Sequence, residues 1–126
     1  MHIITEPTDS PKNVRGHNTS STSVFVQWNE IPSAGDRNGI ILSYTVEYIA
    51  LSSESPQTKV VNAPTTEANL TGLNEYTEYR IFVSASTIKG SGPKSEKEDI
   101  FTDEDSTYPS RLLFILIVLF FSKKFY

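Results

Sequence analysis

Apolar and polar residues alternate with a period of two along three stretches of the chain, and more weakly along two others. This alternation predicts β-strands with one buried face, because successive side chains of a strand point to opposite sides. The clear stretches have their apolar residues at Val24, Val26 and Trp28; at Ile40, Leu42, Tyr44, Val46 and Tyr48; and at Tyr79, Ile81, Val83 and Ala85. The weaker ones are Ala68 with Leu70, and Lys59–Asn62.

Segments rich in turn-forming residues separate these stretches. We expect loops at Pro32–Gly39, Ser52–Pro56 and Lys89–Pro93, since Gly, Pro and Asn favour turn conformations. No window keeps the period of a helix. Many short strands at regular spacing predict an all-β sandwich or barrel.

Composition and charge narrow the range of functions. The 126 residues suit one domain. The net charge of −4 and the absence of a basic patch argue against nucleic-acid binding. The chain has no cysteine, which excludes disulfides, zinc-finger spacing and thiol nucleophiles.

Few residues are suited to catalysis or metal binding. His2 lies near the N-terminus and His17 in an expected loop, and without cysteine neither joins a plausible metal set. Ser91 lacks the flanking residues of a nucleophile elbow. Asp103–Asp105 is an acidic run that we interpret as a solvated linker. We therefore expect no enzyme activity, no cofactor and no metal.

Several motifs, in the right order, resemble a fibronectin type III domain from Asp9 to Asp103. The resemblance rests on Pro11 in the first strand, Trp28 at the end of the second, Tyr44–Tyr48 in the third, Leu70–Leu73 with Tyr76–Tyr79 as a tyrosine corner, Gly90–Ser95 before the last strand, and Thr102–Asp105 as a junction. The resemblance implies a seven-stranded antiparallel immunoglobulin-like β-sandwich. Alternation and resemblance together give a predicted structural core of Trp28, Tyr44, Val46, Leu70, Leu73, Tyr79, Ile81 and Val83.

The last strand departs from the family pattern at Glu98, where the family usually has an apolar residue. A charge on a buried face is costly unless it reaches water. We therefore expect a frayed or twisted edge at this strand, which also discourages edge-to-edge pairing.

Five residues are candidates for surface roles. Asn18 and Asn69 begin glycosylation sequons; we expect Asn18 in a loop and Asn69 on an outward position. Phe25, Ile41 and Phe82 fall on outward phases of their strands, where they could belong to a partner-binding face.

The two ends of the chain differ from its body. We assign residues 1–8 to a linker, 9–103 to the domain, 104–111 to an acidic and polar linker and 112–126 to an apolar tail. Residues 1–8 lack the features of a signal peptide, so an extracellular module would lack its true start. Leu112–Phe121 would span roughly 15 Å as a helix, about half of the hydrocarbon core. A short membrane segment, a lipid-anchor signal and a truncated or misread chain end all remain open.

The resemblance implies a class of function. We expect a non-catalytic protein-binding or spacer module of a cell-surface adhesion or receptor protein, as in receptor tyrosine phosphatase ectodomains, and a fragment of a longer chain. The expected partners are an unidentified protein ligand, neighbouring fibronectin type III modules and, through Leu112–Phe121, the membrane. The alternative is an intracellular structural module of a muscle-type scaffold.

Overall fold

The computed structural model describes residues 3–103. The predicted linker 104–111 and tail 112–126 lie outside the described residues. The elements are β1 (Lys12–Ser20), β2 (Ser23–Asn29), α1 (Ala34–Arg37), β3 (Ser43–Ala50), β4 (Gln57–Asn62), β5 (Glu67–Leu70), β6 (Glu78–Thr87), β7 (Gly90–Ser91) and β8 (Glu98–Phe101). Within residues 3–103, no helix is long and apolar enough to cross a membrane.

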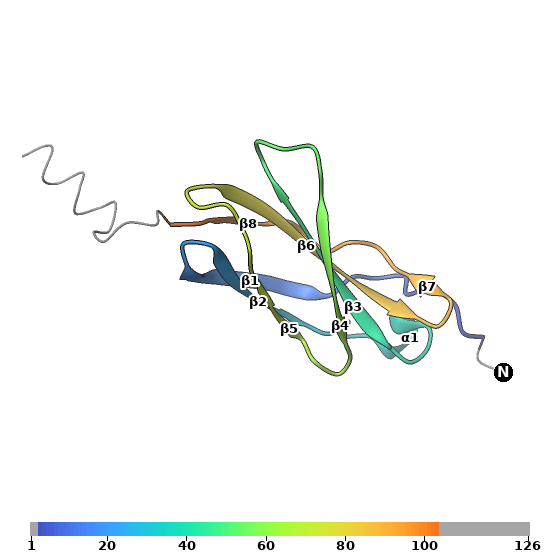
Figure 1. Cartoon of the computed structure of the whole chain (residues 1–126). Helices are drawn as coiled ribbons and strands as arrows, with labels where there is room; N and C mark the ends of the chain where they lie inside the picture. The colour runs from blue at the N-terminus through green and yellow to red at the C-terminus, as the bar shows by residue number, and fades with distance from the viewer. Residues whose placement is uncertain (1–2, 104–126) are drawn as a thin grey trace, which may run out of the picture.

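The strands form two antiparallel sheets that pack face to face (Figure 1). One sheet has the order β1-β2-β5, and the other has the order β4-β3-β6, with β7 and β8 both paired to β6. Because β7 and β8 follow one another along the same edge of β6, they are two pieces of one interrupted last strand. The structure therefore confirms the predicted seven-stranded antiparallel sandwich.

The core lies between the sheets, where the alternation of β2, β5 and β6 places it. Val24, Val26 and Trp28 are at most 1% exposed, and the inward residues of β5 and β6 are buried as well. The Trp28 ring packs against Tyr44 across the sandwich, with ring centroids 5.4 Å apart and planes tilted by 59°. Ring pairs of this tilted geometry add attraction beyond simple area burial.

The prediction that Ile40 and Leu42 extend the buried row of β3 is wrong. Ile40 is 78% exposed and Leu42 is 50% exposed, while Ile41 is partly buried and packs against the core. The paired register of β3 begins only at Ser43, opposite Ser86. The alternation breaks there because the preceding residues belong to the loop after Gly39, whose φ is +144°.

Three predicted loops contain regular structure. The Pro32–Gly39 loop holds the single helical turn α1, and the Lys89–Pro93 loop holds β7. His17 and Asn18, expected in a loop, lie in β1, where they pair with Phe25 and Val24 of β2. The sequence of β1 shows no alternation of apolar and polar residues, so the strand is recognised only by its backbone pairing with β2.

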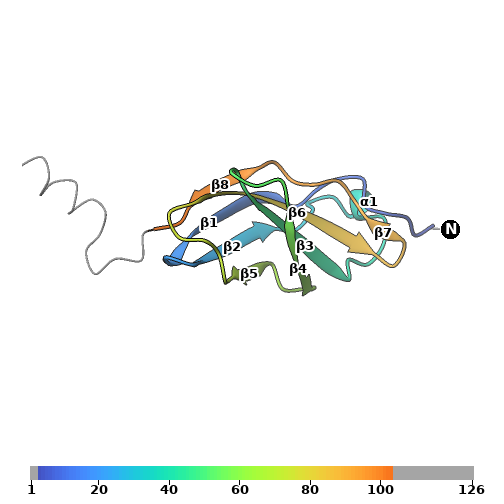
Figure 2. The same cartoon turned by 45° about the horizontal axis from the view of Figure 1, so that its top comes forward.

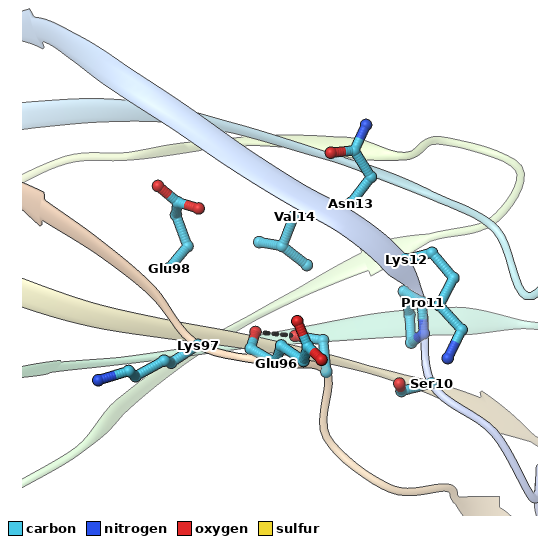
Figure 3. Close-up of a pocket in the computed structure, with 9 residues that line it drawn as sticks. Ser10, Pro11, Lys12, Asn13, Val14, Glu96, Lys97 and Glu98 are labelled. Atoms are coloured by element: carbon cyan, nitrogen blue, oxygen red, sulfur yellow. Dashed lines mark hydrogen bonds between the residues drawn. The ribbon is translucent and has the colours of Figure 1, made fainter.

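The last strand is interrupted just before Glu98. Three bonds connect the interrupted segment to β6: Gly92 N–H donates to the Ala85 carbonyl at 2.9 Å, Ser95 N–H donates to the Val83 carbonyl at 2.8 Å, and Val83 N–H donates to Ser95 Oγ at 2.9 Å. Glu98 is half-buried and lines a pocket of about 310 Å³ between β1 and this segment. Figure 3 shows its side chain extending from β8 toward β1, beside Val14. The sandwich is thus open where the charge replaces an apolar residue.

The described chain enters and leaves the sandwich at opposite ends. It begins at the end that carries α1 and β7, and β8 finishes at the other end (Figure 1). Figure 2 shows β8 lying beside β1 along one side of the sandwich. This arrangement lets several such units follow one another in line.

Candidate interaction surfaces

The N-terminal segment is fastened to the sandwich at the end where the chain enters. Thr5 N–H donates to the Asn38 carbonyl at 3.1 Å, and Thr8 N–H donates to the Asp36 carbonyl at 2.8 Å. The Thr87 hydroxyl donates to the Thr5 carbonyl at 2.7 Å. These bonds connect residues 5–8, assigned from sequence to a linker, with the β2–β3 connection and the end of β6.

Four isoleucines are exposed at this end; we call Ile3, Ile4, Ile40 and Ile88 the isoleucine patch. Ile3, Ile40 and Ile88 are each about three-quarters exposed, and Ile4 is 40% exposed. Ile4 and Ile40 line a shallow hollow with Ala34, Gly35 and Gly39. Several exposed apolar side chains at one place indicate a contact surface more often than a single exposed apolar side chain does.

Gly39 is needed for the patch to form. A side chain at this position would place its Cβ 2.9 Å from Ile4 Cγ2, and φ of +144° is a conformation that other residues rarely adopt. The glycine therefore lets the N-terminal segment lie directly on the loop before β3.

The opposite end carries a smaller apolar group. Leu51, Tyr76 and Phe101 are 45–59% exposed, but the Tyr76 and Phe101 rings pack edge to face with centroids 5.0 Å apart. Because these two rings already cover each other, this end offers less free apolar surface than the isoleucine patch.

Phe25, Ile41 and Phe82, the apolar residues predicted on outward phases, do not form one face. Phe25 lies on β2 and Phe82 on β6, which belong to opposite sheets, and Ile41 packs against the core. Phe25 contacts His17, with ring centroids 5.7 Å apart, and Lys94 Nζ lies 5.6 Å from the Phe82 centroid. The three residues therefore do not lie on one face of the sandwich.

The outer surface of the larger sheet is charged and internally paired. Arg80 donates to both oxygens of Asp99, at 2.9 and 3.1 Å. This bonded guanidinium holds the pKa of the Asp99 carboxyl below its ordinary value. Lys94 and Glu47 form a further ion pair at 2.8 Å. A partner docking here would have to compete with these pairs.

The two sequon asparagines have different surroundings. Asn69 is exposed on β5. Asn18 is half-buried on β1, and its Nδ2 donates to the Phe101 carbonyl at 2.6 Å, which ties β1 to the end of β8.

The eight predicted core residues are all buried, with Leu73 the most exposed at 5%. Asn74 N–H donates to the Tyr79 hydroxyl at 2.8 Å, the bond of a tyrosine corner. Sequence reasoning missed Thr102, which is fully buried beyond β8 and bonds to this corner. It also missed the isoleucine patch, whose only sequence signal is apolar residues within turn-rich segments.

Comparison with known proteins agrees with this architecture. The family model described as "Fibronectin type III domain" matches residues 9–101. The chain belongs to the fibronectin type III family. A solution structure of the fn3 domain of human contactin 1 superimposes with a TM-score of 0.70 at 28% identity, covering 79% of this chain and 82% of that one.

Two curated relatives of this fibronectin type III chain are large proteins. It is 41% identical over 102 residues to receptor-type tyrosine-protein phosphatase F of Mus musculus, covering 79% of this chain and 5% of that protein. It is 42% identical over 91 residues to protein sidekick-2 of Mus musculus, covering 71% of this chain and 4% of that one. The chain thus spans about one twentieth of these relatives, and the match is to a non-catalytic module.

Within residues 3–103, no group of three His, Cys, Asp or Glu side chains is placed to hold a metal ion. The described surface offers apolar contacts and paired charges. Among the described residues, the candidate functional site is the isoleucine patch.

Proposed function

We propose that this chain is a non-catalytic protein-binding and spacer module of a cell-surface adhesion or receptor protein, and that it binds its protein partner through the isoleucine patch. The observation that carries the proposal is the clustering of exposed isoleucines at one end of the sandwich. Ile40 and Ile88 contribute nothing to the core at 78% and 74% exposure, so their apolar character is explained by contact with another surface.

The relatives support the cell-surface part of the proposal. The phosphatase relative is named as a receptor-type protein, and the matched segment there is the same kind of module. The spacer role is supported by the arrangement of the chain, which enters and leaves at opposite ends (Figure 1). Neighbouring fibronectin type III modules and extracellular ligands are both partners that such an end surface can contact.

A binding screen with two matched variants tests the patch. The full chain, given a signal peptide and attached to a multivalent carrier, is applied to a collection of cell-surface ectodomains that includes the chain itself. Ile40→Asp with Ile88→Asp should abolish binding, since a charge at the centre of an apolar contact is desolvated without a partner. Val60→Asp, on β4 and 61% exposed, is the control and should bind like the parent.

Two results would contradict the proposal. Binding that survives the double isoleucine variant would remove the patch from the contact. A failure to bind any ectodomain, together with retention of the natural protein inside cells, would favour the intracellular scaffold alternative.

A further inference from the structure

We propose that Asn69, and not Asn18, carries an N-linked glycan in the exported protein, and that the first sugar of this glycan packs on Phe25. The inference rests on the proposed cell-surface function, because N-glycans are attached to surface loops and strands of exported proteins. It assigns a modification site and explains an outward aromatic residue that the core does not use.

Asn69 has the geometry of an acceptor. It lies between the buried Ala68 and Leu70 on β5, so its side chain points away from the core. Among residues 3–103, its side-chain amide forms no hydrogen bond. Thr71, the third residue of the sequon, is exposed as well. A glycan at Asn69 therefore displaces no interaction of the folded module.

Asn18 has the opposite geometry. Its Nδ2, the atom that would carry the sugar, donates to the Phe101 carbonyl at 2.6 Å. Its Oδ1 is buried and has no hydrogen-bond partner within the described part of the chain. The glycosylated nitrogen would keep one hydrogen, but the sugar on it would crowd the Phe101 carbonyl that Nδ2 contacts between β1 and β8. A sugar at Asn18 would thus strain a bond between β1 and β8, whereas one at Asn69 meets no such bond.

Phe25 is the direct neighbour of Asn69. The two are paired across β2 and β5, and Phe25 is also paired with His17 of β1. Both Phe25 and Asn69 point outward, and side chains paired in this way have Cβ atoms about 5 Å apart. A sugar linked to Asn69 Nδ2 is therefore close enough to lie against the phenyl ring, on the flank not taken by His17.

The chemistry of the two groups suits this contact. One face of a pyranose ring presents C–H groups of slightly positive character, and the face of an aromatic ring is negative. Phe25 is half-buried on a solvated sheet face, and the sugar would cover part of its remaining exposed surface. Removal of that surface from water stabilises the folded state.

Site mapping on exported protein tests the assignment. The full chain, given a signal peptide, is expressed in mammalian cells, and the protein that reaches the cell surface or medium is digested and analysed for glycopeptides. We expect one glycan, at Asn69, which Asn69→Gln removes and Asn18→Gln leaves in place. A glycan at Asn18 on exported protein, or exported protein without any glycan, would overturn the assignment.

A stability comparison tests the contact with Phe25. Glycoprotein trimmed enzymatically to a single sugar is compared with Asn69→Gln by chemical denaturation, in the parent, in Phe25→Thr and in Phe82→Thr. The sugar should raise the folded-to-unfolded ratio about two- to tenfold, the range of one aromatic contact, in the parent and in Phe82→Thr. It should have no effect in Phe25→Thr; an equal effect in all three would refute the contact.

These outcomes are independent of the isoleucine patch. Asn69 lies on the outer face of the β1-β2-β5 sheet, and the patch lies at the end of the sandwich. A module that binds its partner without a glycan refutes only the inference about Asn69, and a glycosylated module that binds no ectodomain refutes only the proposed binding function.

Discussion

Replacing Thr102 by valine removes one hydroxyl from a fully buried site and leaves the shape of the side chain unchanged. Thr102 Oγ1 accepts from the Thr77 N–H at 2.9 Å and donates to the Asn74 carbonyl at 2.7 Å, with the Thr77 carbonyl at 3.1 Å. These bonds connect the end of the last strand to the tyrosine corner between β5 and β6. The substitution removes them and leaves the Thr77 N–H without a partner.

The magnitude follows from those contacts. Two net hydrogen bonds contribute about 1 kcal/mol each, and the partly buried Thr77 N–H left without a partner adds up to about 2 kcal/mol more. We therefore expect Thr102→Val to lower the free energy of unfolding by about 2–4 kcal/mol. In a domain of this size that corresponds to a fall in Tm of at least about 8 °C.

Thr102→Ser is the control, because it keeps the hydroxyl and removes only a methyl group, at a cost of about 1 kcal/mol. Urea denaturation followed by the fluorescence of Trp28, the only tryptophan, measures both variants. If the site were held by packing alone, valine would be tolerated and serine would be the worse replacement. That order of stabilities would refute the reasoning.

Trp28→Ala should lower the free energy of unfolding by about 3–5 kcal/mol, measured by circular dichroism in urea; an unchanged midpoint would place Trp28 outside the core. Tyr79→Phe should cost about 0.5–1.5 kcal/mol by the same measurement, for the bond from Asn74 N–H, and a loss as large as that of Trp28→Ala would contradict this. Asp99→Asn should reduce stability at neutral pH and not in acid. The depressed pKa of Asp99 in the folded state gives stability that is lost as the pH falls through it, so a difference independent of pH would exclude this cause.

Sequence patterns predict the centre of the sandwich well and its margins poorly. Alternation correctly predicts the buried rows of β2, β5 and β6. One face of each strand packs against the opposite sheet, so every second residue must be apolar. Ile40 and Leu42 continue the pattern of β3 into the preceding loop; the Leu42 N–H already donates to the Ser86 carbonyl at 2.9 Å, yet its side chain stays half exposed. Alternation alone contains no information about where a neighbouring strand ends.

Strand β1 and Thr102 show two other limits of the sequence. The inward positions of β1 include Gly16, where a Cβ would lie 2.6 Å from Ile100 Cδ1, so close packing replaces the apolar pattern. Thr102 is a buried hydroxyl, and its role depends on Asn74 and Thr77, which are distant in sequence. For the same reason the isoleucine patch, assembled from three separate segments, becomes visible only in the folded chain.

Hydrogen–deuterium exchange on the complex with a bound ectodomain tests the central claim, that the isoleucine patch is the protein-binding surface. Amides of residues 3–8, 34–42 and 88–90 should exchange more slowly in the complex than in the free protein, because a bound partner covers the end of the sandwich that they form. Amides of β4 should exchange at the same rate in both. Protection confined to β4 or to the outer sheet faces, with none at the patch, would contradict the account.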